Sequence, residues 1–327
     1  MKILVTGGAG FIGSNFCRYV IEKYPMDEVV CLDALTYAGN LENLNDIIGN
    51  EKFNFIKGNI CDEELVDNLF NKERFDVVVN FAAESDVDRS IINSKEFLMS
   101  NIIGVQTLMD ACVKYNVKKF HQISTDEVYG DLPLSDKGDL FYEYSPLRAT
   151  NPYSVSKASA DLLVLSYHRI YKLPVTISRC SNNYGPYQFP EKLIPLTITK
   201  IFSDEKIPVH GKGNNIRDWI HVYDHCSAVD LIIRKGTVGE IYNIGANCQK
   251  QNIDVVKTIL KEMDKEESMI SYVEDRPGND LRYALSNEKI KKELNWEPLY
   301  TFEEGLRSTI EWYKNNREWF NNIAKQV

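Results

Sequence analysis

The sequence predicts an α/β protein with a doubly wound parallel sheet and a smaller C-terminal α/β lobe. Short, continuous apolar runs rich in β-branched residues alternate with longer segments of helical periodicity up to about residue 180. Beyond that point the pattern breaks into shorter segments rich in turn-forming residues. Continuous apolar strands are typical of parallel sheets that helices cover on both faces.

The individual elements follow from the same periodicity. We expect buried strands at residues 2–6, 28–33, 53–58, 76–82, 118–124 and 174–180. Helices are expected between them at residues 11–24, 63–73, 94–116 and 151–172, which gives repeated βαβ units. The C-terminal part is expected to hold helices at 192–205, 224–236, 255–265 and 301–316, a strand at 239–245 and a glycine-rich loop at 210–219. Residues 1–180 and 181–327 are expected to form two domains, with a segment near 217–247 returning to the first.

Composition excludes several classes of function. The 327 residues carry a formal net charge of -9, which argues against a nucleic-acid or anionic-membrane partner. The seven cysteines are scattered and include no CxxC pair, so neither a disulfide framework nor a zinc site is indicated. No apolar run reaches the roughly 18 residues that a membrane span needs, and the N-terminus is unlike a signal peptide. We expect a cytoplasmic protein.

A glycine-rich segment follows the first expected strand and begins the first expected helix. Gly7, Gly10 and Gly13 suit a tight turn that approaches a pyrophosphate, which the helix N-terminus then stabilises. Asp33 ends the second strand 20 residues after Gly13, where a carboxylate accepts hydrogen bonds from an adenosine ribose. Residues 34–40 contain no Arg or Lys for a 2′-phosphate, which favours NAD over NADP. The alternative, a tight turn with a strand-capping Asp, fits less well because strand, spacing and acid occur together.

Two adjacent carboxylates, Asp126 and Glu127, directly follow the apolar run that ends at residue 124 and the intervening Thr125. Taken alone, a solvated turn explains them. In a buried site they can instead divide into an acid and a base, because burial and like-charge repulsion keep one carboxyl protonated beside an ionised neighbour.

Tyr153 and Lys157 stand four residues apart in a segment that Asn151 and Pro152 mark as a helix start, so their side chains face the same way. A free phenol has a pKa of about 10, and a neighbouring ammonium lowers that pKa by favouring the phenolate. The pair is therefore expected to remove a proton from a hydroxyl group. In isolation, a surface tyrosine beside a solvated lysine explains the same spacing.

Together, the glycine-rich segment, Thr125 and the Tyr153–Lys157 pair resemble the extended short-chain dehydrogenase/reductase superfamily. The resemblance implies a Rossmann-type fold in which Tyr153 takes a proton from a substrate hydroxyl and Thr125 holds the reacting oxygen. It also implies that Lys157 holds the nicotinamide ribose. Further NAD contacts are implied for Phe11, Ile12, Asn59, Ile60, Ala82 and Ser124.

Six blocks narrow the resemblance to the dTDP-glucose 4,6-dehydratase family, namely residues 82–91, 124–133, 151–161, 179–196, 211–225 and 275–284. This resemblance runs from residue 1 to about residue 315 and implies a hydro-lyase of deoxysugar biosynthesis. Oxidation at C4 of dTDP-glucose makes the C5 proton acidic, and Glu127 removes it. Protonated Asp126 releases the C6 hydroxyl as water, and return of the hydride to C6 and of a proton to C5 gives dTDP-4-keto-6-deoxyglucose. NAD is therefore expected to stay bound through turnover.

The resemblance also assigns contacts to the nucleotide sugar, from Glu84, Ser85, Thr125, Asn183, Lys192, Leu193, His210, Arg217, Asn252 and Arg276. Arginine suits a diphosphate because its planar fork donates paired hydrogen bonds, although each cation taken singly resembles a solvated surface charge. Some positions depart from the family pattern. Asp86 and Asn279 replace His, His210 replaces a common Tyr, and Asn59 replaces Asp. Asn59 keeps its hydrogen-bonding capacity, whereas the other three leave the exact nucleotide open.

Three other functions stay open on the sequence: dehydration of a UDP-linked hexose, 4-epimerisation of a sugar nucleotide, and a non-catalytic NAD-binding role. An epimerase has no use for a second proton donor, and a binding module needs neither carboxylate. His221 and His225 stand four apart, but no third ligand of suitable spacing is evident, so we expect no metal. The apolar surface of residues 96–115 and 153–171 indicates a homodimer by resemblance, although core burial explains the same pattern.

Overall fold

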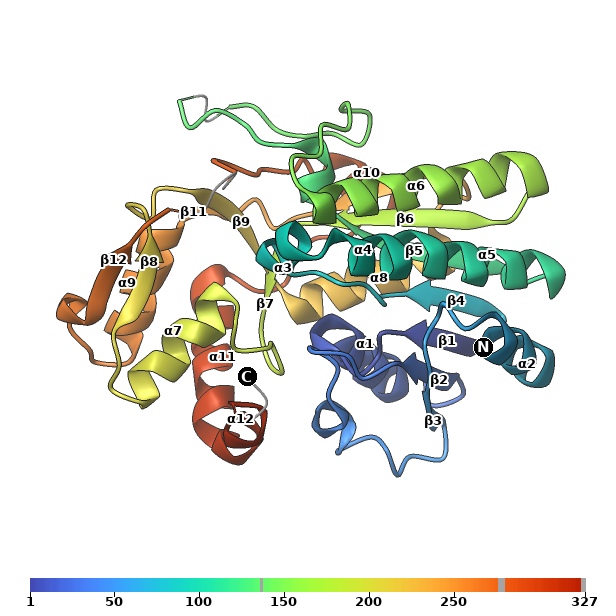
Figure 1. The fold of residues 1–327 in the computed structure, drawn as a ribbon, viewed down its shortest axis with the longest axis horizontal. Coiled ribbons are helices and arrows are strands. Elements are labelled where there is room, and N and C mark those ends of the chain that lie inside the picture. The colour runs from blue at the N-terminus through green and yellow to red at the C-terminus, as the bar shows by residue number, and fades with distance from the viewer. Residues whose placement is uncertain (136–137, 276–279, 325–327) are drawn as a thin grey trace.

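The computed structural model describes residues 1–135, 138–275 and 280–324 as a large lobe and a smaller lobe (Figure 1). The large lobe contains seven strands, which are β1 (Lys2–Thr6), β2 (Glu28–Asp33), β3 (Phe53–Lys57), β4 (Val77–Asn80), β5 (Lys119–Thr125), β6 (Val175–Cys180) and β10 (Ile241–Ile244). They form one sheet in the order β10-β6-β5-β4-β1-β2-β3, and every neighbouring pair is parallel. The expected doubly wound parallel sheet is confirmed. Strand order reverses between β1 and β4, which is where such sheets bind ligands.

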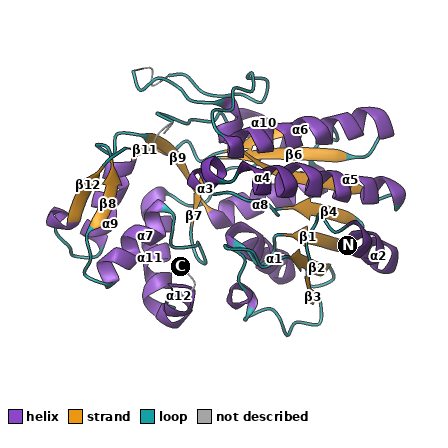
Figure 2. Cartoon of the chain, in the orientation of Figure 1, coloured by secondary structure: helices purple, strands orange, loops and turns teal. Residues whose placement is uncertain are grey.

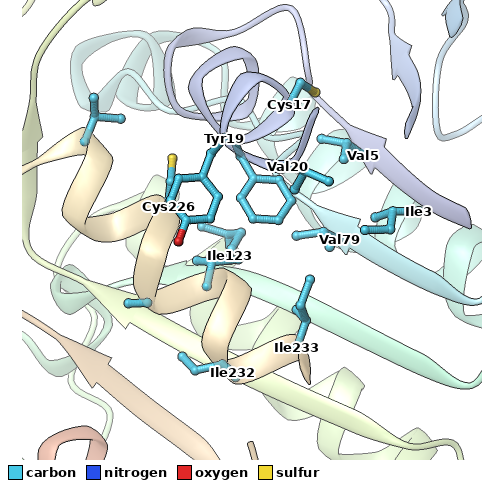
Figure 3. Packing of buried hydrophobic residues seen from close by; sticks show 14 of the residues in the cluster. Ile3, Val5, Cys17, Tyr19, Val20, Val79, Ile123, Cys226, Ile232 and Ile233 are labelled. Atoms are coloured by element: carbon cyan, nitrogen blue, oxygen red, sulfur yellow. The ribbon is translucent and has the colours of Figure 1, made fainter. Parts of the chain in front are cut away.

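Helices cover both faces of the large sheet (Figure 2). One face carries α1 (Phe11–Lys23), α8 (Val222–Lys235) and α10 (Glu288–Leu294), and the other carries α2 (Glu63–Glu73), α5 (Gly104–Lys114) and α6 (Pro152–Tyr171). Alternate residues of β1 contribute to the two layers. Ile3 and Val5 belong to the same buried cluster as Val20 of α1 and Ile232 of α8 (Figure 3), whereas Leu4 packs in the opposite layer.

The expected helix at residues 94–116 is present but not uniform. It follows α3 (Val87–Ile92), begins as α4 (Ser94–Leu98), passes through a π-helical turn at Met99–Ile103, and continues as α5. The π-helical turn packs against α6. Because π-turns widen a helix locally, they often occur where a helix borders a functional site.

The smaller lobe is built from two small sheets and four helices. One sheet contains β7 (Asn182–Tyr184), β9 (Ile216–His221) and β11 (Gln249–Gln251), and the other contains β8 (Ile207–His210) and β12 (Ile270–Val273). The helices are α7 (Leu193–Phe202), α9 (Asn252–Glu262), α11 (Phe302–Asn315) and α12 (Arg317–Ala324). Ile198, Trp219, Ile259 and Leu306 belong to the core that joins them. Short 3-10 turns occur at Leu41–Leu44, Asp126–Tyr129 and Glu267–Met269.

The expectation of a loop at residues 210–219 was wrong for its second half. β9 begins at Ile216, pairs with β7 and β11, and buries Trp219 and Ile220 in the lobe. Strands β7, β8, β11 and β12 and helices α3, α10 and α12 were also not anticipated. Three- and four-residue strands carry too little periodicity to be recognised in a sequence. Of the helices in the described ranges, none has the length and apolar character needed to cross a membrane.

Candidate active site

The glycine-rich turn between β1 and α1 is open on the side of the helix N-terminus. Gly7 has φ +68°, and a Cβ there would lie 2.6 Å from the backbone nitrogen of Ala82. A Cβ on Gly13 would collide with the backbone of Gly7 and Gly8. At Gly10 the nearest atom to such a Cβ is the Gly7 carbonyl oxygen, at 3.3 Å. Gly7 and Gly13 therefore keep the turn compact, and Gly10 leaves room for a ligand to reach the backbone.

The first turn of α1 faces this opening. Within the described chain, no side chain caps the helix at Gly10, so the N–H groups of Phe11, Ile12 and Gly13 are available to an anion. The helix dipole adds positive potential at the same end. Together these features form a phosphate-binding site.

Asp33 supplies the acidic group beside the glycine-rich turn. Its carboxylate oxygens accept hydrogen bonds from the backbone N–H groups of Ala9 (2.9 Å) and Leu35 (2.8 Å). Burial raises the pKa of Asp33, and the two backbone hydrogen bonds oppose that rise. A carboxylate fixed here accepts hydrogen bonds from ribose hydroxyls and repels a 2′-phosphate, so the residues present fit NAD rather than NADP.

Other residues expected to contact NAD lie at the same edge of the sheet. Asn59 and Ile60 follow β3, and Ala82 follows β4, beside Gly7. Asn59 is exposed, and its Oδ1 accepts a hydrogen bond from the Cys61 N–H (2.9 Å). Ile60 is buried and lies close to the backbone of α5.

Residues 124–130, with the sequence STDEVYG, turn sharply at the carboxyl end of β5. Thr125 is the last residue of the strand and caps the 3-10 turn Asp126–Tyr129. Its Oγ1 accepts a hydrogen bond from the Glu127 N–H (3.3 Å) and donates one to Asp126 Oδ1 (3.3 Å). A threonine followed by two acids suits this geometry because hydroxyl caps and negative charge both stabilise a helical N-terminus.

The two carboxyl groups of this turn have different environments. Asp126 is almost fully buried, and burial raises its pKa well above the ordinary value, with further increases from the charges of Glu127 and Asp218. Glu127 is partly exposed. Burial raises the pKa of Glu127 to about 7, against the opposing effect of Arg217 and Lys192. Asp126 therefore keeps its proton to a higher pH than a free aspartate, while Glu127 titrates near neutral pH.

Tyr153 and Lys157 lie on the first turns of α6, where both side chains are buried. The helix begins with a capping box in which Asn151 Oδ1 accepts from the Ser154 N–H (2.9 Å) and Ser154 Oγ accepts from the Asn151 N–H (3.1 Å). Pro152 occupies the first helical position. These caps fix the start of the helix and hence the position of Tyr153 beside the end of β5.

The expected lowering of the Tyr153 pKa by Lys157 was wrong for the protein alone. Burial raises the pKa of Tyr153 well above its usual value, and the charge of Glu127 adds to the rise. A hydrogen bond with Thr125 opposes it. Lys157 instead donates from Nζ to the carbonyl oxygen of Ile123 at 2.6 Å. In the protein alone, burial thus disfavours the Tyr153 phenolate.

Two cations of the smaller lobe that are expected to bind the diphosphate lie near the 3-10 turn Asp126–Tyr129. This turn carries the two expected catalytic carboxyls and is hereafter the catalytic turn. Arg217 and Lys192 both lower the pKa of Glu127, which places their charges near its carboxylate. Arg217 donates to the carbonyl oxygen of Asp280 (2.9 Å), and its guanidinium lies over the Tyr283 ring. The two lobes therefore share one site.

Asp86 changes the surroundings of Lys192. The Lys192 Nζ lies 3.1 Å from a Glu191 carboxylate oxygen and 3.7 Å from a carboxylate oxygen of Asp86. Asp86 also caps α3 by accepting a hydrogen bond from the Arg89 N–H (2.8 Å). Two acids thus compete with any anionic ligand for the charge of this lysine.

Asn101 is a site residue that the sequence analysis missed. It lies in the π-helical turn, almost fully buried, and its Oδ1 accepts from the Glu84 N–H (2.9 Å). Its Nδ2 donates to the Glu84 carbonyl oxygen (3.0 Å) and to Ser156 Oγ (2.8 Å). Asn101 thereby fixes the Glu84 backbone to α6. The expected helix also contains Gln106, so an amide in this segment does not by itself distinguish Asn101.

Glu84 and Ser85 occupy the loop after β4, next to the NAD site. Burial raises the pKa of Glu84, and its Oε2 has no hydrogen-bond partner among the described residues. Ser85 Oγ lies 3.3 Å from the Tyr37 hydroxyl. An unpartnered buried carboxyl oxygen costs free energy unless a ligand satisfies it.

The remaining expected substrate residues are spread over the smaller lobe. Asn183 on β7 lies beside His225, with its Oδ1 2.9 Å from His225 Nδ1. Leu193 begins α7, and His210 ends β8, with its Nδ1 3.1 Å from the Glu274 carbonyl oxygen. Asn252 begins α9, and its buried Oδ1 lacks a hydrogen-bond partner within the described chain. The expected roles of Arg276 and Asn279 fall on residues outside those that the structure describes.

His221 and His225 remain neutral near pH 7, because burial lowers their pKa values to about 4 and about 3. In the described ranges, no group of three or more His, Cys, Asp or Glu side chains is placed to hold a metal ion.

Fold and site together define a dinucleotide-binding enzyme of the extended short-chain dehydrogenase/reductase class. The GDP-mannose 4,6 dehydratase family model matches residues 4–309, and the chain belongs to this family. A dTDP-glucose 4,6-dehydratase from Salmonella typhimurium is 47% identical, over 99% of this chain and 95% of that protein.

Solved structures of dTDP-glucose 4,6-dehydratases are also similar to this chain in fold and sequence. The crystal structure of dTDP-glucose 4,6-dehydratase from Bacillus anthracis in complex with NAD has a TM-score of 0.92 at 48% identity, with 99% of both chains covered. A dTDP-glucose 4,6-dehydratase from Streptomyces venezuelae with NAD bound has a TM-score of 0.95 at 43% identity, covering 99% of this chain and 100% of the other.

Proposed function

We propose that this protein is an NAD-dependent hydro-lyase that converts dTDP-glucose to dTDP-4-keto-6-deoxyglucose. The observation that carries the proposal is the unequal environment of two adjacent carboxyls. Burial raises the pKa of Asp126 well above its usual value, whereas the pKa of Glu127 lies at about 7. A dehydration that removes one proton and delivers another to a leaving hydroxyl needs this combination. The full-length similarity to dTDP-glucose 4,6-dehydratases supports the choice of substrate.

The chemistry divides among five residues. Thr125 holds the C4 hydroxyl, and Tyr153, as the phenolate, takes its proton. Lys157 and the α1 N-terminus would hold NAD, which would supply the hydride acceptor for C4 and the hydride donor for C6. The 4-ketone acidifies the C5 proton, which Glu127 removes. Asp126 donates a proton to the C6 hydroxyl so that it leaves as water, because hydroxide is a poor leaving group. Glu127, protonated in the elimination, returns a proton to C5 when the hydride reaches C6.

The smaller lobe holds the nucleotide diphosphate in this proposal. Arg217 and Lys192 bring positive charge to the edge of the catalytic turn. Asn252 in this lobe and Glu84 in the large lobe each have a buried side-chain oxygen without a partner in the described chain, which can accept a hydrogen bond from a substrate hydroxyl group. We assign Ser85, Asn183, Leu193, His210 and Arg276 to the same nucleotide-sugar contact set. The NAD-binding domain comprises residues 1–180 with the segment near 217–247, and the sugar-nucleotide domain the rest of 181–327.

The protein acts as a cytoplasmic homodimer in this proposal. The outer faces of α3 to α6 expose large apolar side chains on neighbouring helices, including Ile92, Met99, Ile103, Leu162 and Ile170. Ile92 is 85% exposed and Leu162 is 60% exposed, values that are unusual for a monomer surface when they occur in one patch. Two copies that pack these helices together would bury the patch in a four-helix interface.

The test is to incubate the purified protein with dTDP-glucose, without an added reductant, and to measure the alkali-induced absorbance of a 4-keto-6-deoxy sugar. UDP-glucose and UDP-N-acetylglucosamine serve as parallel substrates. We expect product from dTDP-glucose and much slower turnover of the UDP sugars. Absence of product, or release of the C4 epimer, would overturn the proposal, and preference for a UDP sugar would change the nucleotide.

A further inference from the structure

A buried ion pair lies directly behind the proposed catalytic residues. Arg179 on β6 donates from Nε to Asp161 Oδ2 at 2.9 Å, and the two side chains are 3% and 0% exposed. Asp161 lies on α6 one turn after Lys157, which is itself 4% exposed. Burying charges at this depth is costly, so a pair kept here needs a role or strong compensation.

The pair connects the elements that carry the reaction. Arg179 is the β6 partner of Ser124 in the sheet, next to Thr125. Its guanidinium carbon lies 4.8 Å from the centre of the Tyr129 ring. Tyr129 ends the 3-10 turn that carries Asp126 and Glu127, and its hydroxyl donates to Asn243 Oδ1 on β10 (2.8 Å). Asp161 and Arg179 therefore join α6, the end of β5 and the catalytic turn.

Lys157 depends on Asp161 for its charge. Burial disfavours the ammonium form, and the Asp161 carboxylate, one helical turn away, opposes this effect. Among the described residues, Cys180 on β6 also acts on Lys157, and its thiol stays neutral because burial raises its pKa to about 12. From β5, Lys157 receives the neutral carbonyl of Ile123.

The wider surroundings of the pair are also charged. The charge of Arg179 interacts with the carboxyl group of Glu143 as well as with Asp161. Arg179 also donates a long hydrogen bond of 3.5 Å to the Glu143 carbonyl oxygen. Asp126 and Glu127 act on Tyr153 from the catalytic turn. Without Asp161, Lys157 and Arg179 would be two buried cations on facing elements, with Glu143 left to balance Arg179.

We infer that Asp161 is a positioning residue, which keeps Lys157 protonated and, through Arg179, fixes the turn that carries Asp126 and Glu127. This inference rests on the proposed function, because it assigns Asp161 a task through Lys157. An asparagine side chain at position 161 can still accept the Arg179 hydrogen bond but carries no charge. The Asp161→Asn variant therefore separates the electrostatic role from the structural one.

The experiment measures the rate at which bound NAD is reduced on mixing with dTDP-glucose, across a range of pH. Activity that needs the Lys157 ammonium falls as that group loses its proton at high pH. Since Asp161 raises the Lys157 pKa, we expect the alkaline limb of Asp161→Asn to move to lower pH by about one unit, with a roughly tenfold slower rate on that limb. Asp161→Glu keeps the charge and should keep the wild-type limb, even if the extra methylene lowers the thermal midpoint.

Asp230→Asn is the matched control. Asp230 is also buried, and pairs with Arg234 on α8 near the C-terminal end of α1, at the opposite edge of the sheet from the catalytic turn. It should lose thermal stability with an unchanged pH profile. A wild-type alkaline limb in Asp161→Asn would refute the inference. If that variant does not fold, Asp161→Ser removes the same charge and leaves Arg179 in place, and the same shift of the alkaline limb or its absence decides. Failure of the wild-type protein to act on dTDP-glucose would instead count against the proposed function.

Discussion

In the proposed reaction Glu127 and Tyr153 act on different protons, so their removal should stop the reaction at different steps. Glu127→Gln leaves the C4 hydroxyl chemistry intact but removes the base for C5. We expect this variant to reduce bound NAD and to trap it as NADH, with product formation lowered by about a hundredfold or more. Tyr153→Phe should depress NAD reduction itself. Absorbance of NADH after mixing with dTDP-glucose distinguishes the two, and equal loss of NAD reduction in both variants would show that the roles are assigned wrongly.

Glu127 should also make the protein less stable at alkaline pH. Its pKa is raised from 4.5 to about 7 on folding, so its favourable contribution is complete below the lower value and is lost as pH rises through about 7. Above that pH the ionised carboxylate is less well solvated in the fold than in the unfolded chain. Glu127→Gln should therefore be more stable than wild type at about pH 8, by roughly 3 kcal/mol, and unfold at a higher temperature, with a much smaller difference at about pH 4. Thermal melts at the two pH values test this, and a constant difference would contradict it.

Asp86 should weaken the hold on the substrate diphosphate. Its carboxylate lies 3.7 Å from the Lys192 Nζ, where it partly neutralises the charge. Asp86→Asn keeps an oxygen that can cap α3 and removes the negative charge. We expect KM for dTDP-glucose to fall about two- to fivefold with kcat nearly unchanged, and the effect to shrink at high salt. Glu42→Gln, at a partly exposed position of the 3-10 turn Leu41–Leu44, is a charge-matched control, and an equal change in both variants would count against the contact.

The glycine-rich turn should tolerate a methyl group for folding but not for cofactor binding. Among the described residues, the Gly7 carbonyl oxygen is the one atom within 4 Å of a Cβ built on Gly10, at a distance of 3.3 Å. A methyl group at this position therefore finds space at the N-terminus of α1. Gly10→Ala should therefore fold normally and bind NAD about tenfold or more weakly. Gly49→Ala, where no neighbouring atom lies within 4 Å in the described structure, is the control. Titration of NAD by fluorescence measures the difference, and wild-type affinity in Gly10→Ala would exclude this approach for the pyrophosphate.

At the element scale, the sequence was most informative where periodicity is long. The six strands of the large sheet up to Cys180 and the helices between them were predicted to within a few residues, because each is a sustained apolar run or helical repeat. The smaller lobe was predicted poorly. β7 and β11 have three residues each, and their pairing with β9 depends on contacts across the lobe rather than on local pattern.

The candidate site shows the same limit. Asp126, Glu127, Tyr153 and Lys157 could be selected because each stands in a short recognisable block. Asn101 could not, because its role arises from a π-helical turn that no residue in the segment announces. The direction of the Tyr153 pKa was also predicted wrongly, since four-residue spacing does not reveal that Lys157 donates to Ile123 instead.

At the scale of the whole molecule, the apolar patch on α3 to α6 should determine the assembly. Replacing Leu162, which is 60% exposed on α6, with Glu places a charge within the proposed interface. We expect Leu162→Glu to shift the protein from a dimer to a monomer in light scattering after size-exclusion chromatography. Val238→Glu, at an exposed apolar position between α8 and β10, should leave the dimer intact. A wild-type protein that is monomeric at micromolar concentration would rule out this assembly.

The place of β10 in the sheet has a consequence for how the chain is made. β6 is finished at Cys180, but the strand that covers its outer edge begins only at Ile241, after β7, β8, β9 and α8. At roughly 5–20 residues per second, a ribosome leaves that apolar edge uncovered for several seconds. An unpaired strand edge is a template for other chains. Synthesis should therefore depend most on chaperones while the nascent chain includes Cys180 but does not yet include Ile244. A fragment that ends between these two residues should aggregate.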